Sequence, residues 1–104
     1  ESKAFWPIYD AYQAELQKIN EQLGTIIADY ARMHNAGKLT DARARALMDR
    51  YLGAEEAEVR LKRTFAKRLD KVLPGVKVTR YLQIENKIRA IVKYELAGEV
   101  PLAK

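Results

Sequence analysis

Three glutamates lie close together in the middle of the chain, at Glu55, Glu56 and Glu58. Hydrolysis of a glycosidic bond would need two carboxylates held on opposite sides of a substrate. Because these three residues share one predicted helix, they cannot flank a substrate. We expect a solvated surface with ion pairs to Lys62 or Arg63 instead. The acidic cluster therefore predicts no catalytic site.

Other reactive residue types are scarce. The chain has no cysteine, which excludes disulfides and thiolate chemistry, and one histidine, His34. We expect His34 to lie near a helix end, where its charge interacts with the helix dipole, since no second histidine and no cysteine could join it around a metal ion. No glycine-rich phosphate loop and no GxSxG motif is present. We predict that the protein is not an enzyme and has no metal or cofactor.

Composition predicts a single folded domain over residues 1–104. Hydrophobic residues make up 48% and charged residues 32%, which favours a buried core over a disordered tail. No apolar run approaches the ~18–20 residues needed to span a bilayer. The net charge of +5 comes from a basic excess after residue 36, and it suggests an acidic partner, an anionic lipid surface or nucleic acid. No signal peptide is visible, although the chain begins at Glu1 without a methionine.

Apolar residues recur in alternating steps of four and three along the first third of the chain. The series is Phe5, Tyr9, Tyr12, Leu16, Ile19, Leu23, Ile26, Tyr30 and Met33. This heptad spacing predicts a helix over residues 5–36 with one face against a partner helix. A helix of that length extends ~45 Å, which is too long for a compact globule of this size. An extended helical hairpin or a dimer is expected.

Two further helices are predicted, over residues 41–73 and 76–97. Thr40 suits the N-cap of the helix over residues 41–73. Gly98 and Pro101 are expected to end the helix over residues 76–97. The main apolar stripe of the second helix is Leu47, Tyr51, Ala54, Leu61, Phe65, Leu69 and Val72. The stripe of the third helix is Tyr81, Ile84, Ile88, Ile91, Val92 and Leu96. The fold class is therefore all-α, a long antiparallel hairpin with a shorter third helix.

Charged residues lie within or beside the apolar stripes of the second and third helices. Glu58 falls inside the stripe of the second helix, where burial is costly unless the carboxylate is paired. Arg80, Lys87, Arg89 and Lys93 make the third helix basic outside its stripe. We expect a solvated face there, with contact to an anionic protein, a lipid surface or nucleic acid as alternatives.

A minor apolar stripe runs along the second helix beside the main one. Its members are Met48, Leu52, Val59 and Ala66, and its flanks carry Arg45, Lys62 and Arg63. Either the third helix or a second subunit covers this stripe, or the stripe stays partly exposed with a cationic rim. The second arrangement would suit loose protein binding. On that interpretation the client-binding candidates are Arg45, Met48, Leu52, Val59, Lys62 and Arg63.

The stretch GKLTDAR, residues 37–43, contains Leu39-Thr40-x-x-Arg43, which resembles the LTxxQ motif of the Spy/CpxP family of periplasmic stress proteins. In that family the motif opens a helix after a long antiparallel one, and a second copy recurs downstream, here near residues 73–77. Arg43 replaces the glutamine of the first copy, and the second keeps only its leucine. The run KVLPGVKVTRYLQIENKIRAIVKYELAGEVPL is similar to a pattern in small secreted bacterial proteins of like build.

The resemblance implies a curved α-helical homodimer in the periplasm with a concave, positively charged and partly apolar face. Such proteins bind unfolded clients without ATP or modulate sensors of envelope stress, and they have no small-molecule substrate. Two alternatives from other classes stay open. One is a structural helical adaptor that docks a single protein partner through a coiled-coil seam, and the other is a nucleic-acid-binding protein.

Overall fold

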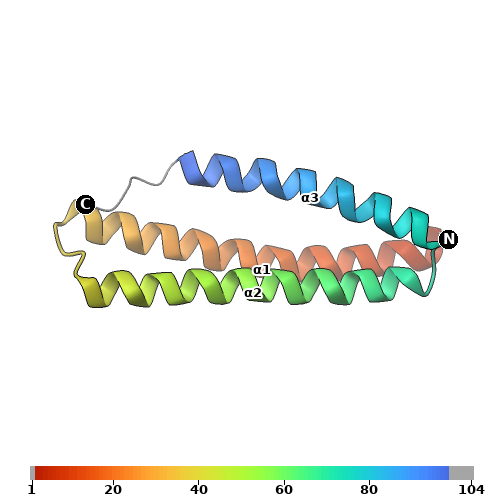
Figure 1. Ribbon diagram of the computed structural model, residues 1–104, viewed down its shortest axis with the longest axis horizontal. Helices are drawn as coiled ribbons and strands as arrows, with labels where there is room; N and C mark the ends of the chain where they lie inside the picture. The colour runs from red at the N-terminus through yellow and green to blue at the C-terminus, as the bar shows by residue number, and fades with distance from the viewer. Residues whose placement is uncertain (1, 99–104) are drawn as a thin grey trace.

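The protein is all-α, as predicted. The computed structural model describes residues 2–98, and over this range it contains three helices and no strand: α1 (Ser2–Asn35), α2 (Asp41–Asp70) and α3 (Gly75–Gly98). The chain is elongated, with principal dimensions of 53 × 20 × 17 Å (Figure 1). In none of these three helices is a stretch both long enough and apolar enough to cross a bilayer. The stop expected at Pro101 lies outside the described residues.

Gly37 ends α1, and Thr40 begins α2 after a short turn. Gly37 has a φ of 66°, its N–H donates to the His34 carbonyl at 3.2 Å, and the Lys38 N–H donates to the Met33 carbonyl at 2.9 Å. These two bonds form a Schellman motif, which satisfies carbonyls at the helix end. Thr40 then caps α2, because its hydroxyl accepts the Arg43 N–H at 3.2 Å.

Arg43, which stands where the resembling motif has glutamine, has a local role of its own. Its guanidinium Nη1 donates to the Lys38 carbonyl at 2.8 Å. A side chain in the first helical turn of α2 therefore binds the backbone of the loop between α1 and α2. The Leu39-Thr40-x-x-Arg43 segment is in this way accounted for by the geometry of one turn.

Two apolar clusters join α1 and α2, which run side by side in opposite directions, and one of them extends to the start of α3 (Figure 1). The cluster near the start of α1 and the end of α2 contains Phe5, Tyr12, Leu16, Phe65, Leu69, Leu73 and Val78. The cluster toward the α1–α2 turn contains Ile19, Leu23, Ile26, Leu47 and Ala54. The rings of Tyr12 and Phe65 stack with centroids 4.2 Å apart. The heptad face predicted for the first helix is thus the one that it buries.

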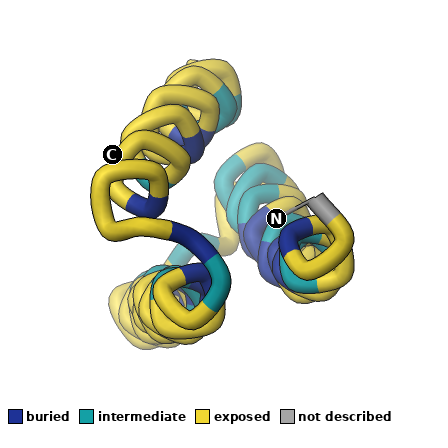
Figure 2. Tube along the Cα trace, turned by 90° about the vertical axis from the view of Figure 1, so that its right-hand side faces the viewer, coloured by how far each residue is buried: buried dark blue, intermediate teal, exposed yellow. Residues whose placement is uncertain are grey.

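The face of α3 that points inward is only partly the predicted one, because Val92 and Leu96 of the predicted stripe lie on it and the isoleucines do not. Viewed along the molecule, the three helices surround the buried residues (Figure 2). The inner face of α3 buries Val78, Glu85 and Arg89, whereas Ile84, Ile88 and Ile91 stay 47%, 48% and 61% exposed. The expectation that these isoleucines form the core-facing stripe is therefore wrong.

The physical reason is that α3 carries two heptad rows side by side. One row is Val78, Leu82, Glu85, Arg89, Val92 and Leu96, and the other is Lys77, Tyr81, Ile84, Ile88, Ile91 and Glu95. The first row is buried or half-buried throughout, and the second is exposed throughout. The second helix shows a smaller deviation, because Tyr51 of its predicted core stripe is 44% exposed.

Two glycines provide a test of this backbone. An added Cβ at Gly24, in the middle of α1, meets nothing within 4 Å, so Gly24→Ala should raise the free energy of unfolding by about 1 kcal/mol through helix propensity. Gly37→Ala should lower it by about 1–2 kcal/mol, because Gly37 has a positive φ. Urea denaturation followed by circular dichroism measures both. Equal effects of the same sign would contradict the assigned turn.

Candidate functional site

A buried carboxylate is the centre of the polar contacts between the helices. Glu58, on the inner face of α2, is 4% exposed. Its Oε1 accepts from Arg89 Nε at 2.7 Å and also from Arg89 Nη2, and its Oε2 accepts from Lys93 Nζ at 2.8 Å. The expectation that Glu58 lies on a solvated face is wrong, although the expected ion pair with Lys62 is present. Lys62 Nζ lies 4.0 Å from Glu58 Oε2, at the edge of ion-pair distance.

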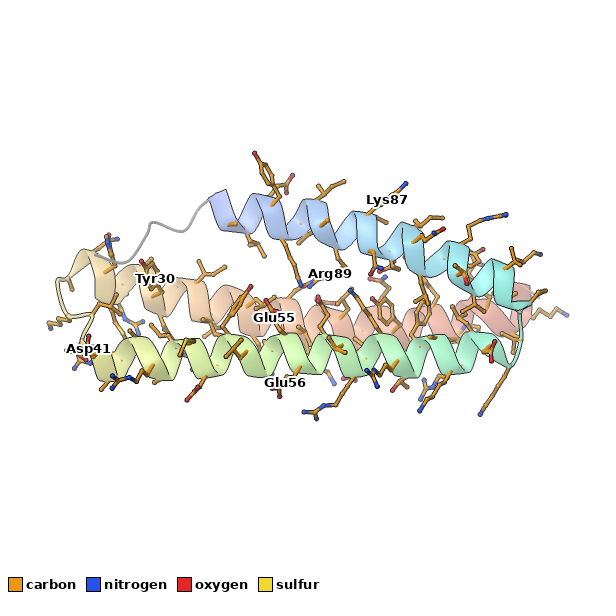
Figure 3. The ribbon with its side chains drawn as sticks, viewed as in Figure 1. Tyr30, Asp41, Glu55, Glu56, Lys87 and Arg89 are labelled. Carbon is orange, nitrogen blue, oxygen red and sulfur yellow. The ribbon has the colours of Figure 1, made fainter. Side chains whose placement is uncertain are left out.

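Arg89 extends this contact to all three helices. It is 3% exposed, and its Nη1 donates to Asn20 Oδ1 on α1 at 2.7 Å. Figure 3 shows Arg89 pointing from α3 toward the two long helices while Lys87 points away from them. Lys62 Nζ adds a bond to Asn86 Oδ1 at 3.1 Å. Two of the four cations expected on a solvated face of α3, Arg89 and Lys93, are thus withdrawn to bind Glu58.

The carboxylate of Glu58 is held in its charged form. Burial by itself would raise the pKa of Glu58, but hydrogen bonds from Lys93 and Arg89, together with their positive charges, outweigh burial and lower this pKa below its ordinary value. A buried ion of this kind is tolerated only when its lone pairs are satisfied. The three nitrogens on Glu58 meet that condition.

A second buried polar group lies nearer the start of α1. Glu85 of α3 is 7% exposed and accepts from Gln13 Nε2 at 3.5 Å, a long contact. The Tyr12 hydroxyl is buried and makes no hydrogen bond of normal geometry. Burial, followed by the charge of Glu85, raises the pKa of Tyr12 well above its ordinary value. This pair is therefore less well satisfied than the one around Glu58.

An apolar groove opens beyond the Glu58 contacts, between the turn end of α1 and α2 and the second half of α3. Its volume is about 580 Å³. Glu55, Glu58 and Lys93 are its charged lining residues, and the remainder are aliphatic, aromatic or alanine side chains. Those are Leu23, Ile26, Ile27, Tyr30, Leu39, Ala44, Leu47, Met48, Tyr51, Ala54, Leu96 and Ala97. The groove suits an apolar occupant.

The six candidate client-binding residues are divided by the structure. Met48 lines the apolar groove and is 54% exposed. Leu52, Val59 and Arg63 line a shallower depression on α2 beside it, and Glu55 borders both. We call Met48, Leu52 and Val59 the α2 strip.

The other two candidates lie differently. Arg45 is exposed and lines neither hollow, and Lys62 is half-buried and bound to Asn86 of α3. The rim of the α2 strip is also of mixed sign, because Glu56 pairs with Arg60 at 3.7 Å along the same edge. Of the three cations predicted for the rim, Arg63 alone lines the depression, and Glu55 and Glu56 line it too.

Glu56 and His34 lie in different parts of the described chain, in the middle of α2 and in the last turn of α1. Glu56 points away from α3 in Figure 3, whereas Glu58 faces it. The ring of His34 is half-buried and stacks on Tyr30 with centroids 5.7 Å apart, and its Nδ1 is buried without a hydrogen bond. Among the residues described, no three acidic or histidine side chains gather as a metal site would require.

Sequence reasoning identified Glu58 as anomalous but not its partners. The signal for Arg89 was present in the inward-facing heptad row of α3, where the charged residues Glu85 and Arg89 interrupt an otherwise apolar series. A buried acid on one helix and a basic interruption on the next are complementary. The asparagine at position 20 carries no comparable signal.

Comparison of the chain with family models, with curated protein sequences and with solved structures yields no match.

The Glu58–Arg89 pair predicts a strong coupling in unfolding experiments. Arg89→Met should lower the free energy of unfolding by about 3–5 kcal/mol, because it leaves a buried carboxylate with Lys93 as its remaining close partner. Glu58→Leu combined with Arg89→Met should recover most of that loss. Lys87→Met, two residues away and exposed, is the matched control and should change it by less than about 0.5 kcal/mol. A double variant no more stable than Arg89→Met would contradict the pairing.

The same carboxylate predicts a dependence of stability on pH. The pKa of Glu58 is lower in the folded chain than its ordinary 4.5, so its contribution is fully present above about pH 4.5 and is lost as the pH falls through the folded value. The difference in unfolding free energy between the parent chain and Glu58→Gln should be constant from pH 7 to 5 and shrink toward pH 3. A difference that grows on acidification would show that Glu58 is not held as a charged group.

Proposed function

We propose that this protein is an ATP-independent chaperone-like or envelope-stress adaptor protein of the periplasm, which holds apolar segments of unfolded proteins. The observation that carries the proposal is the apolar groove together with the exposed α2 strip beside it. Monomeric proteins rarely leave connected apolar surface of this kind uncovered without a binding role. The resemblance of Leu39-Thr40-x-x-Arg43 to the Spy/CpxP motif points the same way.

The chemistry of the groove fits a client rather than a small polar ligand. Its walls are almost entirely apolar, and of its three charged lining residues Glu58 and Lys93 neutralise each other, which leaves Glu55. An occupant is therefore held by burial of apolar surface, which is non-directional and tolerant of sequence. Met48 adds a flexible side chain that adapts to different partners. This combination supports loose binding of several unfolded proteins, with the long helical hairpin and α3 as the two walls.

A second candidate is a structural adaptor that docks one folded protein partner. The observation that favours it is the exposed isoleucine row of α3, whose heptad spacing suits another helix. The number of partners separates the two candidates, because a chaperone binds several unfolded proteins weakly and an adaptor binds one folded protein. Nucleic-acid binding receives less support, since Arg89 and Lys93 are engaged by Glu58.

The proposal predicts that the protein suppresses aggregation of a chemically unfolded client, without ATP, at near-stoichiometric ratios. Light scattering measures this directly. Replacing Met48 and Leu52 together with serine should raise the concentration needed for half-suppression about tenfold, as expected if the two side chains contribute about 1.4 kcal/mol to client binding. Both are about half-exposed, so the change should leave the unfolding transition nearly unaltered.

Val76→Ser is the matched control, because Val76 is 73% exposed and lies outside the groove and the α2 strip. It should suppress aggregation like the parent chain. An unchanged activity of the Met48→Ser/Leu52→Ser variant would show that the proposed surface is wrong. Absence of suppression with several clients would favour the adaptor.

A further inference from the structure

One complete heptad row of α3 faces outward. Tyr81, Ile84, Ile88 and Ile91 follow one another in steps of three, four and three, and all four are exposed. Tyr81 also stacks on Phe5 of α1 at 4.7 Å, so the row begins where α3 meets the rest of the molecule. We call these four residues the isoleucine row.

The isoleucine row differs from the groove in shape and in the kind of partner that fits it. The groove is concave and suits irregular apolar segments, whereas the row is a straight seam on a helix with the period at which helices pack. The inner face of α3 is already occupied by its contacts with α1 and α2, made by Val78, Glu85 and Arg89. Within the described part of the chain, between about 40% and 60% of the surface of each residue in the row stays exposed, and that surface is open to a partner.

We propose that a second copy of this chain covers the isoleucine row, with the two α3 helices packed antiparallel about a two-fold axis at the level of Asn86. An axis at that residue places Ile84 opposite the partner's Ile88 and Tyr81 opposite the partner's Ile91. The two-fold axis generates each of these two pairs a second time. Every residue of the isoleucine row then has a partner in the other copy. This matches the isologous contact of most homodimers.

Charge complementarity selects a second copy and the antiparallel direction. The heptad row continues at one end to Lys77 and at the other to Glu95, both exposed. The same axis at Asn86 sets Lys77 of one copy against the partner's Glu95, twice in the dimer. A parallel pair would instead set lysine against lysine and glutamate against glutamate. Polar residues at seam positions are known to set register and orientation in this way.

This inference names the surface of the dimer and does not depend on client binding by the groove. The groove and the isoleucine row share no residue. Absence of aggregation suppression would not contradict the proposed dimer. A monomeric chain would not contradict the proposed client binding by the groove. The two proposals are therefore tested separately.

Sedimentation equilibrium of the intact chain tests the interface. We expect a dimer, and Ile84→Ser combined with Ile88→Ser should weaken association at least a hundredfold, because four buried isoleucines are lost from the pair. Lys77→Glu alone and Glu95→Lys alone should each weaken it about tenfold, and the two changes together should restore it. Lys38→Glu, in the α1–α2 turn, makes the same change of net charge away from α3 and should have no effect.

Engineered thiols test the direction, since the chain has no cysteine of its own. Residues 77 and 95 are separated by about 27 Å along the helix, so in an antiparallel pair two copies of Lys77→Cys cannot form a disulfide, nor can two copies of Glu95→Cys. The chain that carries both changes should form a covalent dimer under mild oxidation. Circular dichroism before oxidation confirms that each variant is folded.

Each alternative outcome contradicts part of the proposal. A parent chain that is monomeric at all concentrations overturns it and assigns the isoleucine row to a different protein. A dimer that survives Ile84→Ser/Ile88→Ser shows that another face associates. Efficient cross-linking of either single cysteine variant overturns the antiparallel arrangement, as does failure of the double charge reversal to restore association.

Discussion

The contact between Glu58 and Arg89 is the constraint on which the arrangement of the three helices depends. A carboxylate buried on α2 needs cationic partners, and α3 supplies two of them, Arg89 and Lys93. Arg89 also reaches Asn20 on α1, so one guanidinium links all three helices. The apolar clusters join α1 and α2, and Val78 and Leu82 at the start of α3 pack into one of them. The buried ion pair, together with the packing of Val78 and Leu82, accounts for the rotation of α3 about its own axis.

That rotation has consequences at both ends of α3. Turning Arg89 inward places Val78, Leu82, Val92 and Leu96 on the inner face, and it turns Ile84, Ile88 and Ile91 outward. A helix that buried its isoleucines would have left the buried carboxylate of Glu58 without Arg89, and an unpaired buried charge is strongly destabilising. The same rotation puts Lys93 and Leu96 into the apolar groove.

The molecule therefore presents two apolar surfaces of different kinds. The groove is concave, wide and lined by residues from all three helices, so its shape exists only in the assembled fold. The isoleucine row is a single helix face with regular spacing. Irregular unfolded segments fit the first, and a regular helix fits the second. A protein that holds clients on one surface and pairs with its own copy through the other would use both.

Much of the local structure was determined by the sequence alone. The unbroken heptad spacing of residues 5–33, the cap at Thr40 and the stop at Gly37 depend on neighbours within a few positions, so the helices and their turns could be predicted without a fold. The core face of α1 was equally clear, because its apolar residues form one row. The position of Glu58 inside the apolar stripe of α2 was likewise visible from periodicity alone.

Tertiary structure decided the orientation of α3 and everything that follows from it. Two heptad rows on that helix are nearly equal in apolar content, and periodicity cannot choose between them. The choice rests on pairing a charge on α2 with a charge 31 positions away in sequence, which no local pattern contains. The groove, the hydrogen bonds of Lys62 and Lys93 and the exposure of the isoleucine row all require this orientation of α3. That orientation satisfies the physical condition that a buried ion must be neutralised wherever the chain can reach it.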